Sequence, residues 1–205
     1  MKQDHIFFDI ETSSLDYDSA EILDMAAIRT DRTGDILAAY SDRIRPNREV
    51  DPKSAKVNGY NSSDWANAQE FKSAVAAMAG VILNPKFDTK YVVVAHFSEF
   101  DKTILTNQCK AHSIEMPFKR AWLDTAQIAW PYAFNDMLSG RSLDTLCKYF
   151  GVVNKNPHTA AGDAAATMHA YWAMMRRLTP ALMAEEFLVR KGGQKLDSIR
   201  KLVGL

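Results

Sequence analysis

The sequence has little cysteine and no cysteine spacing that would build a disulfide framework or a zinc site. Its 205 residues include two cysteines, Cys109 and Cys147, which lie far apart in apolar patterns typical of helices. This usage fits a reducing cytosol better than a disulfide scaffold. We interpret both thiols as buried core residues.

An excess of charge of either sign is also missing. The chain has 25 Lys and Arg residues and 25 Asp and Glu residues, so its formal net charge is +0. This balance excludes a broad field that attracts polyanions or membranes. A nucleic-acid substrate would therefore have to be held by local contacts or by metal ions.

Long hydrophobic runs are absent as well. No stretch reaches the about 18 consecutive apolar residues of a membrane span. The N-terminus has no basic region followed by an apolar run, as a secretory signal would. We therefore expect a soluble, cytoplasmic protein with no membrane partner.

Strands and helices alternate in the hydrophobic pattern, and 47% of the residues are hydrophobic, enough for one well-packed core. The predicted strands lie at 5–11, 21–30, 36–46, 91–96 and 121–125, and the predicted helices at 69–82, 98–112, 142–150 and 160–178. Residues 45–65 are rich in Pro, Asn, Ser and charge, which predicts an exposed loop with little regular structure. This order favours an α/β fold in which helices pack against a mixed sheet.

Two acidic residues end the first predicted strand, in the segment FFDIETSS. Side chains alternate along a strand, so Asp9 and Glu11 share one face while Ile10 points to the other. Their backbone positions are roughly 7 Å apart, from which two carboxylates can converge on one cation. The alternative is a strand end at which both acids reach water, and this pair alone does not decide between the two.

Two further acids interrupt apolar helical faces. Asp101 lies within a stripe that includes Phe97 and Leu105, and Asp163 begins a similar face in the last predicted helix. A desolvated carboxylate is costly without a partner, so each belongs near a helix N-terminus, in a pair or at a metal. Each Asp taken singly fits a first-turn acid stabilised by the helix dipole. Taken with Asp9 and Glu11, they are candidate oxygen ligands for Mg²⁺ or Mn²⁺.

A histidine precedes the last of these acids, in NPHTAAGD. Pro157 favours an extended residue before it, so His158 is expected in the loop that leads to the helix of Asp163. A histidine with an unperturbed pKa of about 6.5 can take a proton from water near neutral pH. A surface or capping role is the alternative, and His96 at the end of YVVVAH is a rival for a role in the site.

The motifs resemble, in their order, those of the DEDD superfamily of 3′-to-5′ exonucleases, in its histidine-containing subtype. They are FFDIETSSL, VVAHFSEFD and HTAAGD, and the resemblance also covers EILDMAAIR, VNGY, WLDT and SLDTLCKYFG. It implies an RNase H-like α/β fold with a five-stranded mixed sheet and helices on both faces. The exonuclease domain would span residues 1–178, and a short helical extension, interrupted at Gly192 and Gly193, would span 179–205.

The resemblance also implies a two-metal hydrolysis that releases nucleoside 5′-monophosphates from the 3′ end of a single strand. Two Mg²⁺ or Mn²⁺ ions would be bound. Asp9, Glu11 and Asp163 would hold one ion, Asp9 would bridge to the second, and Asp101 would support that second ion through water. His158 would be the general base that activates the attacking water.

Four positions match places where this family contacts the substrate, namely Thr12, Leu15, Asn58 and Phe100. The sequence departs from the family at three points. Phe97 stands where an Asn is usual, Asn58 stands where a His is common, and residues 13–14 are Ser-Ser in place of Thr-Gly. These changes affect how the nucleotide is bound, and they leave the proposed metal ligands and the proposed general base unchanged.

Several functions remain open on the sequence alone. The leading hypothesis is an exonuclease that favours DNA, with a polymerase or another replication or repair protein as a candidate partner. An exoribonuclease of the same family is an alternative. A non-catalytic, polymerase-associated module that binds nucleic acid is another, as is a structural domain whose acids cap helices.

Overall fold

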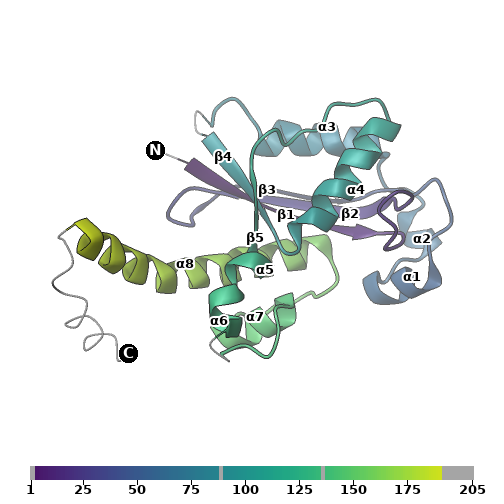
Figure 1. The fold of residues 1–205 in the computed structure, drawn as a ribbon. Coiled ribbons are helices and arrows are strands. Elements are labelled where there is room, and N and C mark those ends of the chain that lie inside the picture. The colour runs from purple at the N-terminus through teal and green to yellow at the C-terminus, as the bar shows by residue number, and fades with distance from the viewer. Residues whose placement is uncertain (1–2, 88–89, 135–136, 191–205) are drawn as a thin grey trace.

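A five-stranded mixed sheet forms the centre of the molecule (Figure 1). The computed structural model describes residues 3–87, 90–134 and 137–190, the last range by its backbone alone from residue 179. The strands are β1 (Gln3–Thr12), β2 (Ile22–Thr30), β3 (Ile36–Arg43), β4 (Lys90–Ala95) and β5 (Trp122–Asp124), in the order β3-β2-β1-β4-β5. The first three form an antiparallel meander, and β4 and β5 add in parallel. The predicted fold class is confirmed.

Helices cover both faces of this sheet, as the fold class requires (Figure 1). The longer ones are α3 (Phe71–Ile82), α4 (Ser98–Ala111), α7 (Leu143–Phe150) and α8 (Ala160–Arg190). Side chains alternate along β1, so its apolar residues pack in two hydrophobic clusters, one on each face of the sheet. Phe8 packs in a cluster with residues of α3 and α4, whereas Phe7 packs on the opposite face against Tyr171 of α8. Both faces of β1 are therefore buried along its middle, and the acids Asp9 and Glu11 lie toward its carboxyl end.

The segment 45–65 differs from the expected loop, because it contains α1 (Pro52–Asn58) and α2 (Ser62–Trp65). Each helix begins at a side-chain cap. Asp51 accepts a hydrogen bond from the backbone N–H of Lys53, with Pro52 at the first helical position, and Asn61 caps the second helix. Helices this short carry no apolar stripe, so hydrophobic periodicity does not reveal them. The short helices α5 (Thr125–Ile128) and α6 (Trp130–Phe134) were missed for the same reason.

The expected position of Phe97 in a buried stripe is wrong. Phe97 caps α4 with a left-handed backbone, φ 58°, and its side chain is exposed. Because Phe97 lies outside the helix, the helical periodicity that buries Ile104 and Leu105 does not extend to it.

The last helix passes without a break through residue 178, the expected end of the exonuclease domain, and continues to Arg190. The interruption expected at Gly192 and Gly193 lies outside the described residues. Among the helices that the structure describes, none has the length and apolar character needed to cross a bilayer.

Candidate active site

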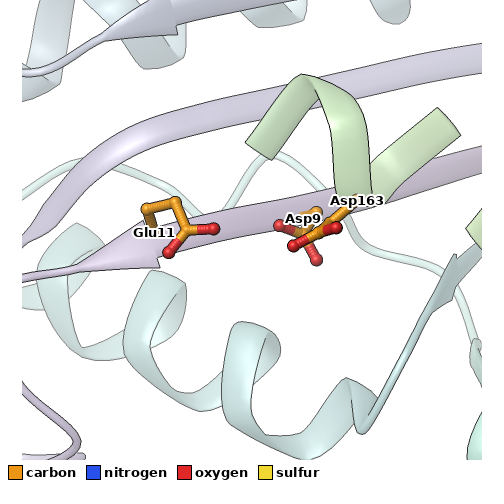
Figure 2. Close-up of side chains that lie close together, drawn as sticks. All are labelled: Asp9, Glu11 and Asp163. Atoms are coloured by element: carbon orange, nitrogen blue, oxygen red, sulfur yellow. The ribbon is translucent and has the colours of Figure 1, made fainter. Parts of the chain in front are cut away.

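Three carboxylates meet at the carboxyl end of β1 (Figure 2). Asp9 and Glu11 project from the same side of β1, and Asp163 reaches them from the first turn of α8. One carboxylate oxygen from each residue lies within 4.8 Å of the others. The strand and the helix thus bring together acids that are separated by about three quarters of the chain.

Burial and mutual repulsion strain this cluster. Burial raises the pKa of Asp9 well above its usual value, and the negative charges of Asp101, Asp163 and Glu11 raise it further. Burial also raises the pKa of Glu11 to about 8, with added repulsion from Asp163 and Asp24. A divalent cation among these oxygens would relieve the repulsion, and oxygen is the donor that Mg²⁺ and Mn²⁺ prefer. The donor set therefore fits such an ion.

Asp101 lies behind this cluster rather than within it. It is buried in the first turn of α4, and its Oδ1 accepts a hydrogen bond of 3.2 Å from the backbone N–H of Ile10. Ile10 stands between Asp9 and Glu11, so this bond ties α4 to the strand end. Asp101 remains close enough for its charge to raise the pKa of Asp9.

The segment before α8 wraps around Asp163. The side-chain amide of Asn154 donates to one carboxylate oxygen of Asp163, and the backbone N–H of His158 donates to the other at 3.2 Å. Gly162 makes this wrapping sterically feasible, since a Cβ there would lie 1.9 Å from the Asn156 carbonyl oxygen. His158 is exposed, and together with Asp163 it lines a cavity of about 510 Å³.

His96 has a different environment from His158. Its Nδ1 lies 2.8 Å from the Thr125 hydroxyl, which joins the end of β4 to α5. Burial lowers the pKa of His96 to about 4, an effect that the charge of Asp124 only partly opposes. His96 is therefore neutral at pH 7 and enclosed, whereas His158 is open to solvent.

A second, smaller cavity adjoins Glu11. Thr12, Leu15 and Asn58 line its volume of about 150 Å³, together with Lys53 of α1. The Asn58 amide donates to the Thr12 carbonyl at 3.1 Å, which fixes α1 against the strand end. The structure thus brings together three of the four expected substrate contacts. Phe100 is not among the lining residues and packs instead against Tyr17.

Two residues near the acids were not anticipated. Asp24 of β2 pairs directly opposite Glu11, and its carboxylate accepts a hydrogen bond from the backbone N–H of Ala160. An acid within the apolar run EILDMAAIR was a visible signal for it. The sequence gives no such indication for Lys53, because the sequence of a helix as short as α1 does not reveal which of its side chains face a cavity.

A mixed sheet of this strand order with acids at the end of its central strand defines the exonuclease form of the RNase H-like fold. The crystal structure of E. coli exonuclease I in complex with a dT13 oligonucleotide has this fold, with a TM-score of 0.72, 19% identity and coverage of 90% of this chain and 43% of the other. A family model described as exonuclease, of the RNase T type, matches residues 6–171. The chain belongs to this exonuclease family.

Curated relatives in bacteria are DNA polymerase III proteins. The subunit epsilon of DNA polymerase III from Treponema pallidum is 28% identical over 174 residues, which cover 82% of this chain and 74% of the relative. The PolC-type DNA polymerase III of Thermotoga petrophila is 25% identical over 199 residues, which cover 96% of this chain. The matched part is only 13% of that long polymerase.

Proposed function

We propose that the protein is a divalent-metal-dependent 3′-to-5′ exonuclease that releases nucleoside 5′-monophosphates from single-stranded nucleic acid, with DNA favoured. The observation that carries this proposal is the convergence of Asp9, Glu11 and Asp163 at one strand end, in a chain of the exonuclease family. The names of the relatives, all DNA polymerase III proteins, support DNA as the substrate and a polymerase as the partner.

The residues divide the chemistry among them. Asp9, Glu11 and Asp163 would hold the cations, with Asp9 shared between two of them and Asp101 acting through water. When bound, such ions neutralise the scissile phosphate and stabilise the attacking and leaving oxygens. His158 would take the proton from the attacking water, and the 3′ oxygen of the penultimate nucleotide would leave.

The cavity beside Glu11 suits the terminal nucleotide. Leu15 and Val57 present apolar surface to a base, and such contact is insensitive to sequence because every base has a stackable face. Lys53 supplies a cation for a phosphate oxygen, which positions the strand without reading its sequence.

The test is digestion of end-labelled single strands by the parent protein and by Asp163→Asn. We expect the parent to shorten a 5′-labelled strand stepwise in Mg²⁺ or Mn²⁺ and to be inactive in EDTA. Asp163→Asn keeps the size of the side chain but removes its charge, so it should abolish the activity. Asp35→Asn, an exposed acid in the turn before β3, is the matched control and should retain it.

Matched DNA and RNA strands in the same assay decide the substrate. Faster digestion of RNA would overturn the DNA preference and leave the reaction class intact. Binding of the strand by the parent without any hydrolysis would instead support a non-catalytic module and contradict the proposal.

A further inference from the structure

Large aromatic side chains are exposed in the segments that follow β4 and β5. Phe97 is 47% exposed, Trp130 is 39% exposed, and Phe134 is 78% exposed. Phe97 caps α4, and the other two belong to α6. Exposed rings that lie together, as those of Trp130 and Phe134 do, mark binding surfaces more often than scattered apolar residues do.

The rings of α6 are held together with a cation. The centroids of Trp130 and Phe134 are 5.0 Å apart, and the Arg141 guanidinium lies 3.9 Å from the Trp130 centroid. Arg141 is fixed in this position, since its Nη1 donates to the Ala126 carbonyl at 3.1 Å. The result is a surface of two tilted aromatic rings with a guanidinium group over one of them.

Hydrogen bonds and ring contacts link this surface to the start of α4, beside the candidate active site. Phe97 directly precedes α4, whose first turn carries Asp101, and its ring packs against His96 at 4.7 Å between centroids. The backbone N–H of Phe97 donates to Oδ1 of Asp124 at 3.1 Å, and Nδ1 of His96 lies 2.8 Å from the Thr125 hydroxyl. Both residues are thereby tied to the start of α5. Because Arg141 also bonds α5, at the Ala126 carbonyl, the contacts run from Phe97 through the start of α5 to Arg141 and on to Trp130 of α6.

Phe97 also stands where the resemblance to the family leads one to expect an asparagine. An asparagine there could form hydrogen bonds, whereas phenylalanine offers only a ring face and edge. The ring is exposed in spite of its apolar character, at a residue whose backbone is left-handed. An exposed ring of this kind is expected where a side chain contacts a ligand rather than where it packs in the core.

The chemistry of the surface points to a single strand as its occupant. Aromatic rings accompanied by arginine are the elements that bind single-stranded nucleic acid without sequence preference. The chain has 25 basic and 25 acidic residues, so phosphate contacts alone provide little of the attraction for a long strand. Stacking of bases on aromatic rings does not depend on net charge, so it can supply the attraction for the strand that a chain of balanced charge does not provide.

We propose that Phe97, Trp130, Phe134 and Arg141 form a stacking track for the nucleotides upstream of the scissile phosphodiester. The track leads away from the strand end of β1 toward α6, so that the terminal nucleotide occupies the catalytic edge while the preceding bases stack outside it. This inference rests on the proposed function and extends it to substrate length. A strand long enough to reach α6 gains contacts that a mononucleotide ester lacks.

The test compares a long and a minimal substrate. The long one is a twelve-nucleotide thymidine strand, and the minimal one is the p-nitrophenyl ester of thymidine 5′-monophosphate, which cannot reach α6. In Phe134→Ala and Trp130→Ala, loss of one base stack should raise KM for the strand roughly 5- to 100-fold. The rise for the ester should be far smaller, and Phe134→Trp should restore strand binding because it restores a ring.

Ile36→Ala is the matched control. Ile36 is 59% exposed on β3, at the opposite edge of the sheet from β5, so its truncation removes an exposed apolar side chain away from the track. Equilibrium binding of a 5′-fluorescent strand, measured by anisotropy in the Asp163→Asn background, separates affinity from turnover. We expect weaker binding in the Phe134→Ala and Trp130→Ala proteins than in Ile36→Ala.

The outcomes separate this proposal from the proposed function. If the parent hydrolyses both substrates and the α6 variants bind the strand as tightly as Ile36→Ala does, the track is overturned and the exonuclease stands. That result would indicate a protein partner for the aromatic surface. If the parent hydrolyses neither substrate, the proposed function itself fails. Thermal melting of each variant identifies any loss caused by misfolding, and Phe134→Trp then provides the decisive comparison.

Discussion

The Asp24 carboxylate accepts a hydrogen bond from the backbone N–H of Ala160 at 3.0 Å, which links β2 to the first residue of α8. Asp24 is also the cross-strand neighbour of Glu11. Asp163 follows Ala160 within the same helical turn, so this hydrogen bond helps to fix the acid of α8 relative to the acids of β1. Asp24 is thus positioned to orient the cluster without belonging to it.

Asp24→Ala should therefore weaken metal binding. Loss of a capping hydrogen bond costs about 0.5–2 kcal/mol of stability, and it frees the start of α8 to move relative to β1. We expect a higher half-saturating Mn²⁺ concentration for activity and a smaller rise in melting temperature on adding Mn²⁺. Asp24→Asn keeps an oxygen acceptor and should lie closer to the parent. Equal Mn²⁺ dependence in all three proteins would contradict a positioning role.

The stability of the metal-free protein should fall as pH rises. The pKa of Glu11 is about 8 in the folded protein against 4.5 for the free side chain, so between these values the folded state binds more protons than the unfolded state. The free energy of unfolding then decreases with pH across this window. We expect lower stability at pH 8 than at pH 6 in urea melts with EDTA.

Mg²⁺ should reverse this trend, because a bound cation favours the ionised carboxylates. Glu11→Gln, which cannot ionise, should flatten the dependence in EDTA. If the metal-free protein instead gains stability between pH 6 and pH 8, the pKa of Glu11 is not raised by burial and by repulsion from the neighbouring acids.

Gly162→Ala should disturb the site through the backbone. The added Cβ would lie 1.9 Å from the Asn156 carbonyl oxygen, so the segment that carries His158 must move away from α8. Overpacking of this kind typically costs about 1–3 kcal/mol. Lower kcat and a lower melting temperature are expected.

Gly80→Ala is the control for this change, because a Cβ there in α3 meets nothing within 4 Å. Replacing a helical glycine in open space should stabilise the protein by about 0.5–1 kcal/mol. If both alanine variants behave alike, close approach at Gly162 does not shape the site.

Much of the fold could be predicted from the sequence, because long apolar segments with a clear period define β1, β2, β4 and α8. Short elements could not, since α1 begins at a side-chain cap and α6 buries only Tyr132, so neither has an apolar stripe. The same limit applies to the site. Acids at a strand end and at helix starts were visible, but the hydrogen bond between Asp24 and Ala160 spans 136 positions and has no local signal.

Phe97 shows a different limit. Its spacing from Leu105 is that of a helical apolar stripe, which predicts burial. A left-handed backbone at the cap overrides this periodicity and exposes the ring. Such a conformation is uncommon for a residue other than glycine, so sequence pattern gives no warning of it.

His158→Ala should lower kcat by about 10²- to 10⁴-fold, the usual range for a positioned general base. The loss should shrink as pH rises, since hydroxide then needs no base. His96→Ala tests the rival. Because the half-buried His96 ring contacts the Thr125 hydroxyl, its loss should affect melting temperature more than the pH profile of kcat. A larger kcat loss for His96→Ala than for His158→Ala across the pH range would assign the base to His96.

The protein should act distributively, releasing its strand after one or a few nucleotides. Repeated cycles on one strand require many phosphate contacts, and each contact makes binding more sensitive to salt. With 25 basic and 25 acidic residues, and acids concentrated at the site, little charge remains for a long basic track. Affinity that comes from stacking and bound metal should fall only slightly with added salt.

An end-labelled strand in large excess over the enzyme distinguishes the two modes. A distributive enzyme shortens the whole population gradually, so intermediate lengths appear before any strand is fully degraded. Fully degraded strands beside untouched full-length ones would indicate a processive enzyme. A polymerase that tethers the enzyme to its strand would raise the local concentration of the 3′ end. Adding such a partner should therefore shift digestion from gradual shortening of all strands toward complete degradation of single strands, with no change in the chemistry at the carboxylates.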